Sequence, residues 1–332
     1  MSELREKAGS PYIFRTRVTE LLGIEYPIIG GCMQYITGPE FVAAISNAGA
    51  LGIMSSAMFS TQEDFRSAVR KLKALTDKPF AVNLNLFQAL RPIDNRQYLE
   101  VILAEGVPVV EFSGNRPEES LLARLKDAGI KVLHKCVSIR HALTAQRLGV
   151  SCITLMGSEG GGHIGEWGLT TMSLIPRATG LLDVPIVAAG GITDGRSFLA
   201  ALDLGAEGVL MGTRLLLTRE CPIHDNIKRA LIGATELDTI QILGVVHNQL
   251  RVWRNEAALK AQELEDNNAS MEEIFQVVAG TNTKRLLEDG DVNAGVLACS
   301  QSVGVITEIN TVSEVIGGMI EEAHTIRTRL GN

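Results

Sequence analysis

The chain lacks the features that mark a secreted or membrane-spanning protein. Residues 1–19 are polar and charged, with no apolar core of a signal peptide, so no secretory signal is expected. No apolar run is long enough to cross a bilayer, so membrane insertion is not expected either. The five cysteines are scattered and form no C-x-x-C pair, which argues against a disulfide framework and a zinc site. These absences predict a cytoplasmic protein with reduced thiols and no metal centre.

Two further absences narrow the class of function. The net charge is −7 and no block of Lys and Arg stands out, so nucleic acid is not expected as a partner. No G-x-G-x-x-G motif follows the first predicted strand, which counts against a Rossmann dinucleotide site. What the chain does have is size. Its 332 residues, 45% of them hydrophobic and 21% charged, are enough for one large domain with an appendage.

Between residues 27 and 211, short apolar runs alternate with amphipathic helical segments. The runs are Pro27–Gly30, Ala50–Met54, Phe80–Leu84, Val107–Glu111, Lys131–His134, Ser151–Leu155, Pro185–Ala188 and Gly208–Met211. The helical segments are Glu40–Asn47, Gln62–Leu75, Gln97–Ala104, Glu118–Asp127, Ile139–Arg147 and Arg196–Leu204. Alternation predicts a parallel sheet, and eight units favour a closed (β/α)8 TIM barrel over the alternative, an open doubly wound sheet. We therefore predict an α/β fold with a barrel core over residues 12–221.

The alternation stops after Met211, and residues 222–332 read as mostly helical. The predicted helices there are Asp225–Gly233, Glu256–Glu265, Met271–Val278, Thr283–Leu287 and Ser313–Leu330. This stretch is too long to close a barrel alone, so we interpret it as the last barrel helices plus a helical cap over a substrate pocket. The alternative is a structural appendage or a surface that forms a homodimer.

One glycine-rich loop follows the sixth predicted strand. The segment Ser158–Gly165 reads SEGGGHIG and surrounds a single histidine with glycines. Glycine lets a backbone approach a flat ligand closely, and histidine transfers protons near neutral pH. We therefore predict that His163 is catalytic and that Gly162 lies against a bound cofactor.

Two more glycine-bearing loops follow the seventh and eighth predicted strands, where TIM barrels often bind phosphate. The first contains Gly190 and Gly191, and the second contains Gly212 and Thr213. Backbone N–H groups, a helix dipole and the Thr213 hydroxyl suit a phosphate monoester. Tight turns alone would explain either loop, but the pair at both expected positions indicates a phosphate site.

Polar or glycine residues also follow the first, third and fifth predicted strands. They include Gly31 and Met33 after the first strand, Asn83 in the third, and Lys135 directly after the fifth. A phosphate site, an amide and a lysine at one barrel mouth suit a phosphate-bearing cofactor with a flat ring, and FMN is the natural candidate. The charge of Lys135 would stabilise the anionic edge of a reduced flavin, although a solvated rim charge is the alternative for this lysine.

Six motifs in this order and spacing resemble the nitronate monooxygenase family, formerly called 2-nitropropane dioxygenases. These motifs are Gly30–Gln34, Pro79–Leu84, His134–Cys136, Gly161–His163, Ala188–Gly195 and Met211–Arg214. The family also contains FMN-dependent NAD(P)H:quinone reductases and flavin enoyl-acyl-carrier-protein reductases. The resemblance covers most of the chain, from Phe14 to at least Ile227, and implies an FMN-containing barrel.

The resemblance also implies a role for individual residues. His163 would be the catalytic or substrate-orienting residue over the flavin. The cofactor-binding residues are Gly31, Met33, Asn83, Lys135, Gly162, Gly190, Gly191, Gly212 and Thr213, with the phosphate on the last four. One departure stands out, because Cys32 stands where the family usually has the second glycine of Gly-Gly-Met. We interpret this thiol as a packing residue, because no neighbouring group argues for a lowered pKa.

Members of such a family differ in chemistry, so the function is predicted as a set of alternatives. The first is an FMN-dependent oxidoreductase that oxidises a nitronate with O2, or passes hydride from NADH or NADPH to a quinone-like acceptor. The second is an enoyl reductase acting on a CoA or acyl-carrier-protein thioester, and the third is a flavin-free phosphate-binding barrel. For the second, Arg251 and Arg254 are candidate ligands of a CoA phosphate, although we prefer to interpret them as ordinary surface arginines.

Overall fold

A closed ring of eight parallel strands organises the protein, which a computed structural model describes over residues 14–87 and 94–331. The strands are β1 (Ile28–Gly30), β2 (Leu51–Ser55), β3 (Phe80–Asn85), β4 (Val109–Ser113), β5 (Lys131–Cys136), β6 (Cys152–Met156), β8 (Ile186–Ala189) and β9 (Gly208–Met211). The ring closes because β1 pairs with both β2 and β9. The predicted TIM barrel is confirmed, strand for strand. Residues 12 and 13, with which the predicted barrel range begins, lie outside the described residues.

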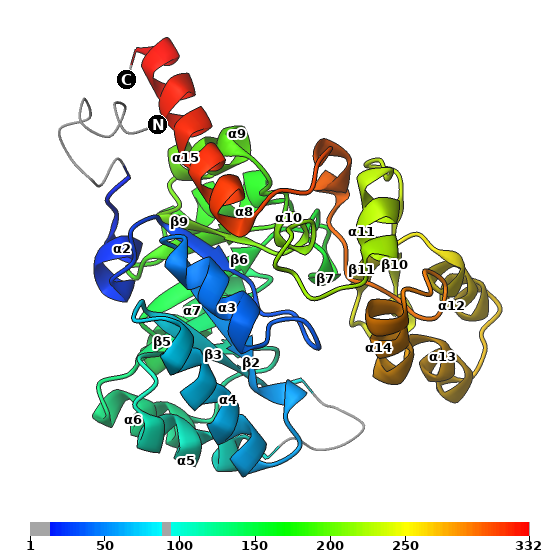
Figure 1. Cartoon of the computed structure of the whole chain (residues 1–332), viewed down its shortest axis with the longest axis horizontal. Helices are drawn as coiled ribbons and strands as arrows, with labels where there is room; N and C mark the ends of the chain where they lie inside the picture. Colours follow the sequence, from blue (N-terminus) through cyan, green and yellow to red (C-terminus); the bar gives the residue numbers. More distant parts are fainter. Residues whose placement is uncertain (1–13, 88–93, 332) are drawn as a thin grey trace.

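Helices cover the outside of the ring (Figure 1). They are α3 (Pro39–Asn47), α4 (Gln62–Leu75), α5 (Asn95–Glu105), α6 (Glu119–Asp127), α7 (Ile139–Leu148), α8 (Thr171–Thr179) and α9 (Gly195–Asp203), preceded by α2 (Arg17–Leu22) and with η1 (Ser56–Met58) after β2. Local sequence sets many of their ends. Thr61 and Ser138 cap the N-termini of α4 and α7 through their side chains, and Gly149 ends α7 in the left-handed conformation.

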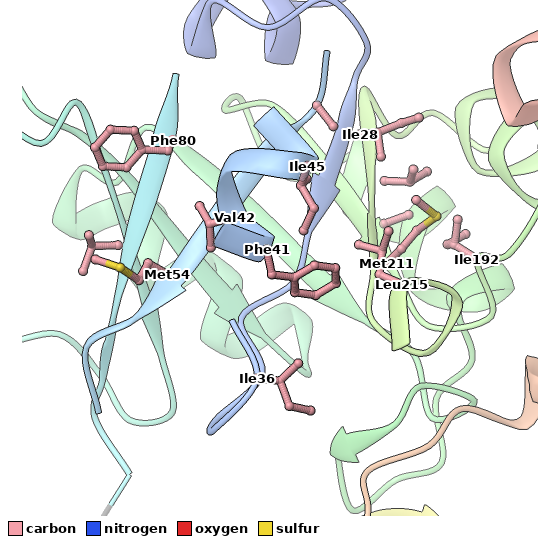
Figure 2. Packing of buried hydrophobic residues seen from close by; sticks show 14 of the residues in the cluster. Ile28, Ile36, Phe41, Val42, Ile45, Met54, Phe80, Ile192, Met211 and Leu215 are labelled. Atoms are coloured by element: carbon pink, nitrogen blue, oxygen red, sulfur yellow. The ribbon is translucent and has the colours of Figure 1, made fainter. Parts of the chain in front are cut away.

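The side chains of the strands alternate between two apolar regions. One lies between the strands and the helices, and Figure 2 shows Phe41, Val42 and Ile45 of α3 among strand side chains in this region. The other fills the ring itself and includes Ile29, Leu51, Ile53, Ala81, Val109, Leu133, Val187 and Leu210. Because side chains alternate along a strand, the residue two positions after each interior residue also points into the ring. Polar residues near the strand ends therefore lie above an apolar floor.

The chain leaves the ring after β9 and returns with α15 (Val312–Leu330), which packs against α9 and α3. The intervening elements are α10 (Thr213–Leu216), α11 (Asp225–Ile232), β10 (Thr239–Ile242), η2 (Gly244–Val246), β11 (Leu250–Trp253), α12 (Glu256–Asp266), α13 (Met271–Val278), α14 (Gly280–Asp289) and η3 (Gln301–Val305). Each predicted helix of this region is present. The hairpin of β10 and β11 is not among the predicted elements, so the expectation of a mostly helical stretch was incomplete.

We call Thr239–Asp289 the cap. Much of its apolar core is separate from the barrel's and is formed by residues such as Ile242, Val252, Ala258 and Ile274. The cap lies to one side of the ring (Figure 1). Within the described ranges, no helix is long and apolar enough to cross a membrane. The division of the chain at residue 221 stays a prediction.

The cap reaches the barrel through a small antiparallel sheet of order β10-β11-β7. Strand β7 consists of Gly162 and His163, which lie opposite Arg251 and Leu250 of β11. The glycine-rich segment predicted as a loop therefore contributes a strand to the cap sheet. This pairing fixes the backbone of His163 to an element far away in sequence.

Candidate active site

Four side chains form a polar layer inside the barrel, at the ends of three neighbouring strands. They are Asn83 of β3, Glu111 and Ser113 of β4, and Lys135 of β5. Asn83 Nδ2 donates to Glu111 Oε2 at 2.7 Å and to Ser113 Oγ at 3.1 Å. Lys135 Nζ lies 4.0 Å from Glu111 Oε2, and its side chain keeps 20% of its surface exposed. The predicted site residues Asn83 and Lys135 are thus brought together by a residue that joins both.

Glu111, like Ser113, is a member of this layer that the sequence reasoning missed. It is fully buried, and its Oε1 atom has no hydrogen-bond partner among the described residues. Buried carboxylates are uncommon unless paired, and unsatisfied buried oxygens are rarer still. A signal was present, because a glutamate at the end of the apolar run Val107–Glu111 is a charge at the catalytic end of a barrel strand.

His163 lies half-buried on β7, with its ring stacked on Phe87. The two ring centroids are 4.5 Å apart, and the planes are inclined by 31°. Burial first, and next the positive charge of Lys135, lower the pKa of His163 to about 4. The imidazole is therefore neutral at pH 7, able to donate one hydrogen bond and to accept another. Phe87, which follows β3, is another residue that the sequence reasoning did not single out.

The histidine loop is anchored by Arg251, whose interpretation as a surface arginine was wrong. This residue of β11 is only 6% exposed. Its Nε donates to the carbonyl oxygen of Ser158 at 2.8 Å, and a second guanidinium nitrogen donates to Thr239 Oγ1 at 3.1 Å. Pairing between β7 and β11 buries the side chain between the loop and the cap. Arg254, which follows the last residue of β11, is exposed as expected.

Ser300 holds the same loop from the other side. Its Oγ donates to the carbonyl oxygen of Glu159 at 2.7 Å, and its N–H donates to Thr213 Oγ1 at 2.9 Å. A Cβ at Gly161 would lie 2.8 Å from the nitrogen of Ser300 and closer still to Cys299, so only glycine fits there. Ser300 therefore links the histidine loop to the loop after β9.

The two predicted phosphate loops differ in why they contain glycine. Gly190 and Gly191 have φ of +93° and +78°, and a Cβ on Gly190 would lie 3.0 Å from the carbonyl oxygen of Gly157. Conformation and packing therefore account for both. Gly212 has an ordinary φ of −117°, and the nearest atom to a Cβ there would be Met33 Sδ at 3.9 Å. Neither the backbone conformation nor contacts within the protein require glycine at position 212. Close approach of a ligand to the backbone would require it.

The loop after β1 lies next to the same region. A Cβ on Gly31 would lie 2.7 Å from Leu210 Cδ2, so packing against β9 explains this glycine. Met33 is half-buried beside Gly212. The thiol of Cys32 is half-buried, and its pKa is raised to about 11, first by burial and next by the charge of Glu111. A protonated thiol fits its interpretation as a packing residue.

Among the residues that the structure describes, no group of three or more His, Cys, Asp or Glu side chains could hold a metal ion. The polar layer offers one carboxylate beside an ammonium and an amide. Such a set suits an organic ligand with hydrogen-bonding groups and a negative charge.

The protein-family comparison decides the assignment. A model described as nitronate monooxygenase matches residues 15–99 and 89–322, which is nearly the whole chain. The chain belongs to the nitronate monooxygenase family. It is an oxidoreductase, as are its relatives, and proteins of this family are in general flavin-dependent. The predicted resemblance is confirmed.

Similar proteins within and around the family carry different names. A protein of Rhodococcus jostii, named (3aS,4S,5R,7aS)-5-hydroxy-7a-methyl-1-oxo-octahydro-1H-indene-4-carboxyl-CoA dehydrogenase, is 33% identical over 93% of this chain and 96% of its own. A probable nitronate monooxygenase of Staphylococcus saprophyticus is 33% identical over 76% of this chain and 82% of its own. The solved structure of FabK from Thermotoga maritima is 36% identical, with a TM-score of 0.88 over 95% of this chain and 98% of that one.

Proposed function

We propose that this chain is an FMN-dependent oxidoreductase that acts on an acyl thioester of coenzyme A or of acyl carrier protein, with NADH or NADPH as electron partner. The observation that carries the proposal is the position of His163, which stands on a strand shared with the cap and under the electrostatic influence of Lys135. The Rhodococcus relative supports the thioester class, because its name gives a carboxyl-CoA as the compound it dehydrogenates. The alignment covers 93% of this chain, which is too much for the cap to lie outside it.

The residues at the strand ends fit FMN. Gly212 has room above it for a close ligand, and the polar layer combines an ammonium with an amide. We assign the phosphate to Gly190, Gly191, Gly212 and Thr213, and the ring system to Gly31, Met33, Asn83, Lys135 and Gly162. When bound, FMN would supply a reversible two-electron carrier for hydride.

Lys135 and Met33 would act on the ring from two directions. The ammonium of Lys135 would stabilise negative charge at the edge of the ring in the reduced cofactor. It is preorganised, because strand β5 is paired on both sides within the closed ring. Met33 would offer an adaptable apolar contact beside Gly212 of the phosphate loop after β9.

His163 acts as a neutral imidazole in this proposal. Its N–H would donate a hydrogen bond to the thioester carbonyl oxygen, whose negative charge grows as hydride adds to the β-carbon of an enoyl thioester and an enolate forms. Stacking on Phe87 and pairing of β7 with β11 hold the ring in one orientation. Because its pKa is about 4, the imidazole carries no extra proton at pH 7 and does not serve as a general acid in its protonated form. A proton delivered to product therefore comes from solvent or from a second group.

The test is an anaerobic absorbance experiment on protein reconstituted with FMN. NADH or NADPH should bleach the flavin band, and a 2-enoyl-CoA should then restore it within the turnover time. A protein that neither retains FMN nor gains colour upon reconstitution would leave only the flavin-free barrel. Bleaching by pyridine nucleotide with reoxidation by a quinone, and by no thioester, would move the substrate to the quinone class.

Nitronate oxidation with O2 is the second candidate. The neutral imidazole of His163 favours it, because such a group can accept the proton of a nitroalkane or orient its anion. The staphylococcal relative supports it as well. Anaerobic bleaching by propionate 3-nitronate, with no bleaching by NADH or NADPH, would select this function and exclude the thioester proposal.

A further inference from the structure

Glu111 is a buried charge that the proposed chemistry does not use directly. Strand alternation places it inside the ring, because Val109 lies in the interior apolar cluster while Val110 and Phe112 lie in the outer one. It has no exposed surface, and one of its two oxygens has no partner in the described part of the chain. A buried carboxylate is costly to maintain, so its contacts need an explanation beyond packing.

The first contact is with Asn83. A side-chain amide has two N–H donors and one carbonyl acceptor. Both donor bonds of Asn83 go to protein oxygens, at 2.7 Å to Glu111 Oε2 and at 3.1 Å to Ser113 Oγ. Asn83 Oδ1 in turn accepts from Ser113 Oγ at 3.4 Å, and Asn83 is only 2% exposed, so the carboxylate and the hydroxyl together fix the orientation of a buried amide.

The second contact is with Lys135, 4.0 Å from the same carboxylate oxygen. Both charges also act on Cys32, since the carboxylate raises the pKa of this thiol and the ammonium lowers it. Because Cys32 belongs to the loop after β1, on the other side of the barrel mouth, the two charges face a common space. A ligand in that space meets the ammonium already partly offset by the carboxylate.

We infer that Glu111 is a positioning residue with two effects, given FMN at the strand ends as proposed above. It fixes the orientation of the buried Asn83 amide below the ring, and it reduces the positive charge that Lys135 presents to the ring edge. The second effect keeps the reduced, anionic form of the cofactor less stable than Lys135 alone would make it. Glu111 thereby sets the reducing power of the bound cofactor, without touching the reacting atoms.

The decisive variant is Glu111→Gln, which keeps an oxygen for the Asn83 amide and removes the negative charge. Sulfite adds to oxidised flavin and leaves a negative charge at the ring edge, so its Kd measures the local charge without turnover. We expect sulfite to bind about tenfold more tightly to the variant. The midpoint potential should rise in parallel, and a tenfold change corresponds to about 30 mV for a two-electron couple.

Two further variants make the result interpretable. Glu111→Ala removes charge and acceptor together, so we expect the same gain in sulfite affinity together with weaker FMN binding, measured by fluorescence titration of apoprotein. Thr154→Val is the matched control, because Thr154 is a buried residue of β6 whose hydroxyl also has no partner among the described residues, but it carries no charge. Its sulfite affinity should equal that of the wild type.

The outcomes separate this inference from the proposed function. If wild-type protein binds no FMN, the proposed function fails. If wild type binds FMN and Glu111→Gln leaves both the sulfite Kd and the midpoint potential unchanged, Glu111 has only a structural role and the inference is overturned. If Thr154→Val shifts sulfite affinity as much as Glu111→Gln, the effect comes from interior repacking, and the inference is again wrong.

Discussion

The polar layer and the histidine loop are held in different ways. Asn83, Glu111 and Lys135 stand on strands that are paired on both sides within a closed ring. His163 stands on a two-residue strand that is paired on one side only, with β11 of the cap. The barrel therefore fixes the charges that would face a cofactor, and a separate element fixes the residue that would face the substrate. Changes in the cap can alter the placement of His163 and its neighbour Gly162 while leaving the polar layer intact.

The largest effect should come from His163→Ala. Removing a positioned hydrogen-bond donor or base typically costs 10²–10⁴-fold in rate, so we expect about that loss in kcat. FMN affinity should change little, because the polar layer and the phosphate loops are untouched. Steady-state kinetics and an FMN titration measure the two properties.

His247→Ala is the control for this prediction. His247 belongs to the segment after η2, its side chain is 81% exposed, and it lies within ion-pair distance of Glu166. The variant should retain wild-type turnover. If His163→Ala kept full turnover as well, the histidine would have no part in the chemistry.

A smaller effect is expected from Arg251→Met, which breaks the link between cap and histidine loop. The variant loses two hydrogen bonds from a charged donor, each worth about 1.5–3 kcal/mol when buried. We expect the free energy of unfolding to fall by roughly 3–6 kcal/mol and turnover to fall by roughly tenfold, with FMN binding retained. Urea unfolding and kinetics provide the measurements.

Arg254→Met is the matched control, because Arg254 lies in the same segment but is exposed. Its unfolding free energy should stay within about 0.5 kcal/mol of the wild type. Equal losses in the two variants would show that the cap, and not the anchor at Arg251, is the sensitive element. Loss of FMN binding in Arg251→Met would contradict the conclusion that the cap positions His163 independently of the cofactor site in the barrel.

The glycines give a third comparison, between Gly31→Ala and Gly212→Ala. The added methyl group at position 31 would meet Leu210, so overpacking should reduce stability by about 1–3 kcal/mol. For a methyl group at position 212, the nearest atom beyond the adjoining residues is Met33 Sδ at 3.9 Å, so stability should not change. FMN should bind several-fold more weakly to this variant. Thermal unfolding of the apoproteins tests stability. Unchanged FMN affinity in Gly212→Ala would argue against a close ligand at that loop.

The smallest expected effect is the absence of a pH dependence near neutrality. A pKa of about 4 for His163 means that its neutral form persists as the pH falls from 8 to 5, and is lost only as the pH falls through 4. An ordinary histidine would lose its neutral form near pH 6.5. The rate of the half-reaction with substrate should therefore be flat from pH 8 to 5, as measured by stopped-flow absorbance. A midpoint near 6.5 would contradict the burial of the ring.

The barrel was predictable because its signals are local and repeated. Each strand is an apolar run followed by an amphipathic segment, and the predicted Gln62–Leu75 coincides with α4. Helix α8 escaped prediction, and Pro176 within it interrupts the helical pattern. The strands β10 and β11 are four residues each and lie between strongly helical stretches, with no two-residue glycine turn between them.

The site was predictable in its residue types but not in its connections. The motifs located His163, Asn83 and Lys135, because each follows or ends a strand of recognisable pattern. The burial of Arg251 and the role of Glu111 depend on which strands become neighbours in space. Strand β7 exists only through its pairing with β11, so no local pattern of its own two residues could reveal it.

The position of α15 has a consequence for how the chain is made. Its partners α3 and α9 are complete once β9 has formed, yet α15 leaves the ribosome only after the whole cap. At about 5–20 residues per second, the intervening roughly one hundred residues take on the order of 5–20 s to synthesise. During that interval the apolar surface of α3 and α9 that α15 covers in the folded protein stays exposed to solvent. Nascent chains of this enzyme therefore present a hydrophobic, aggregation-prone surface that chaperones would have to shield.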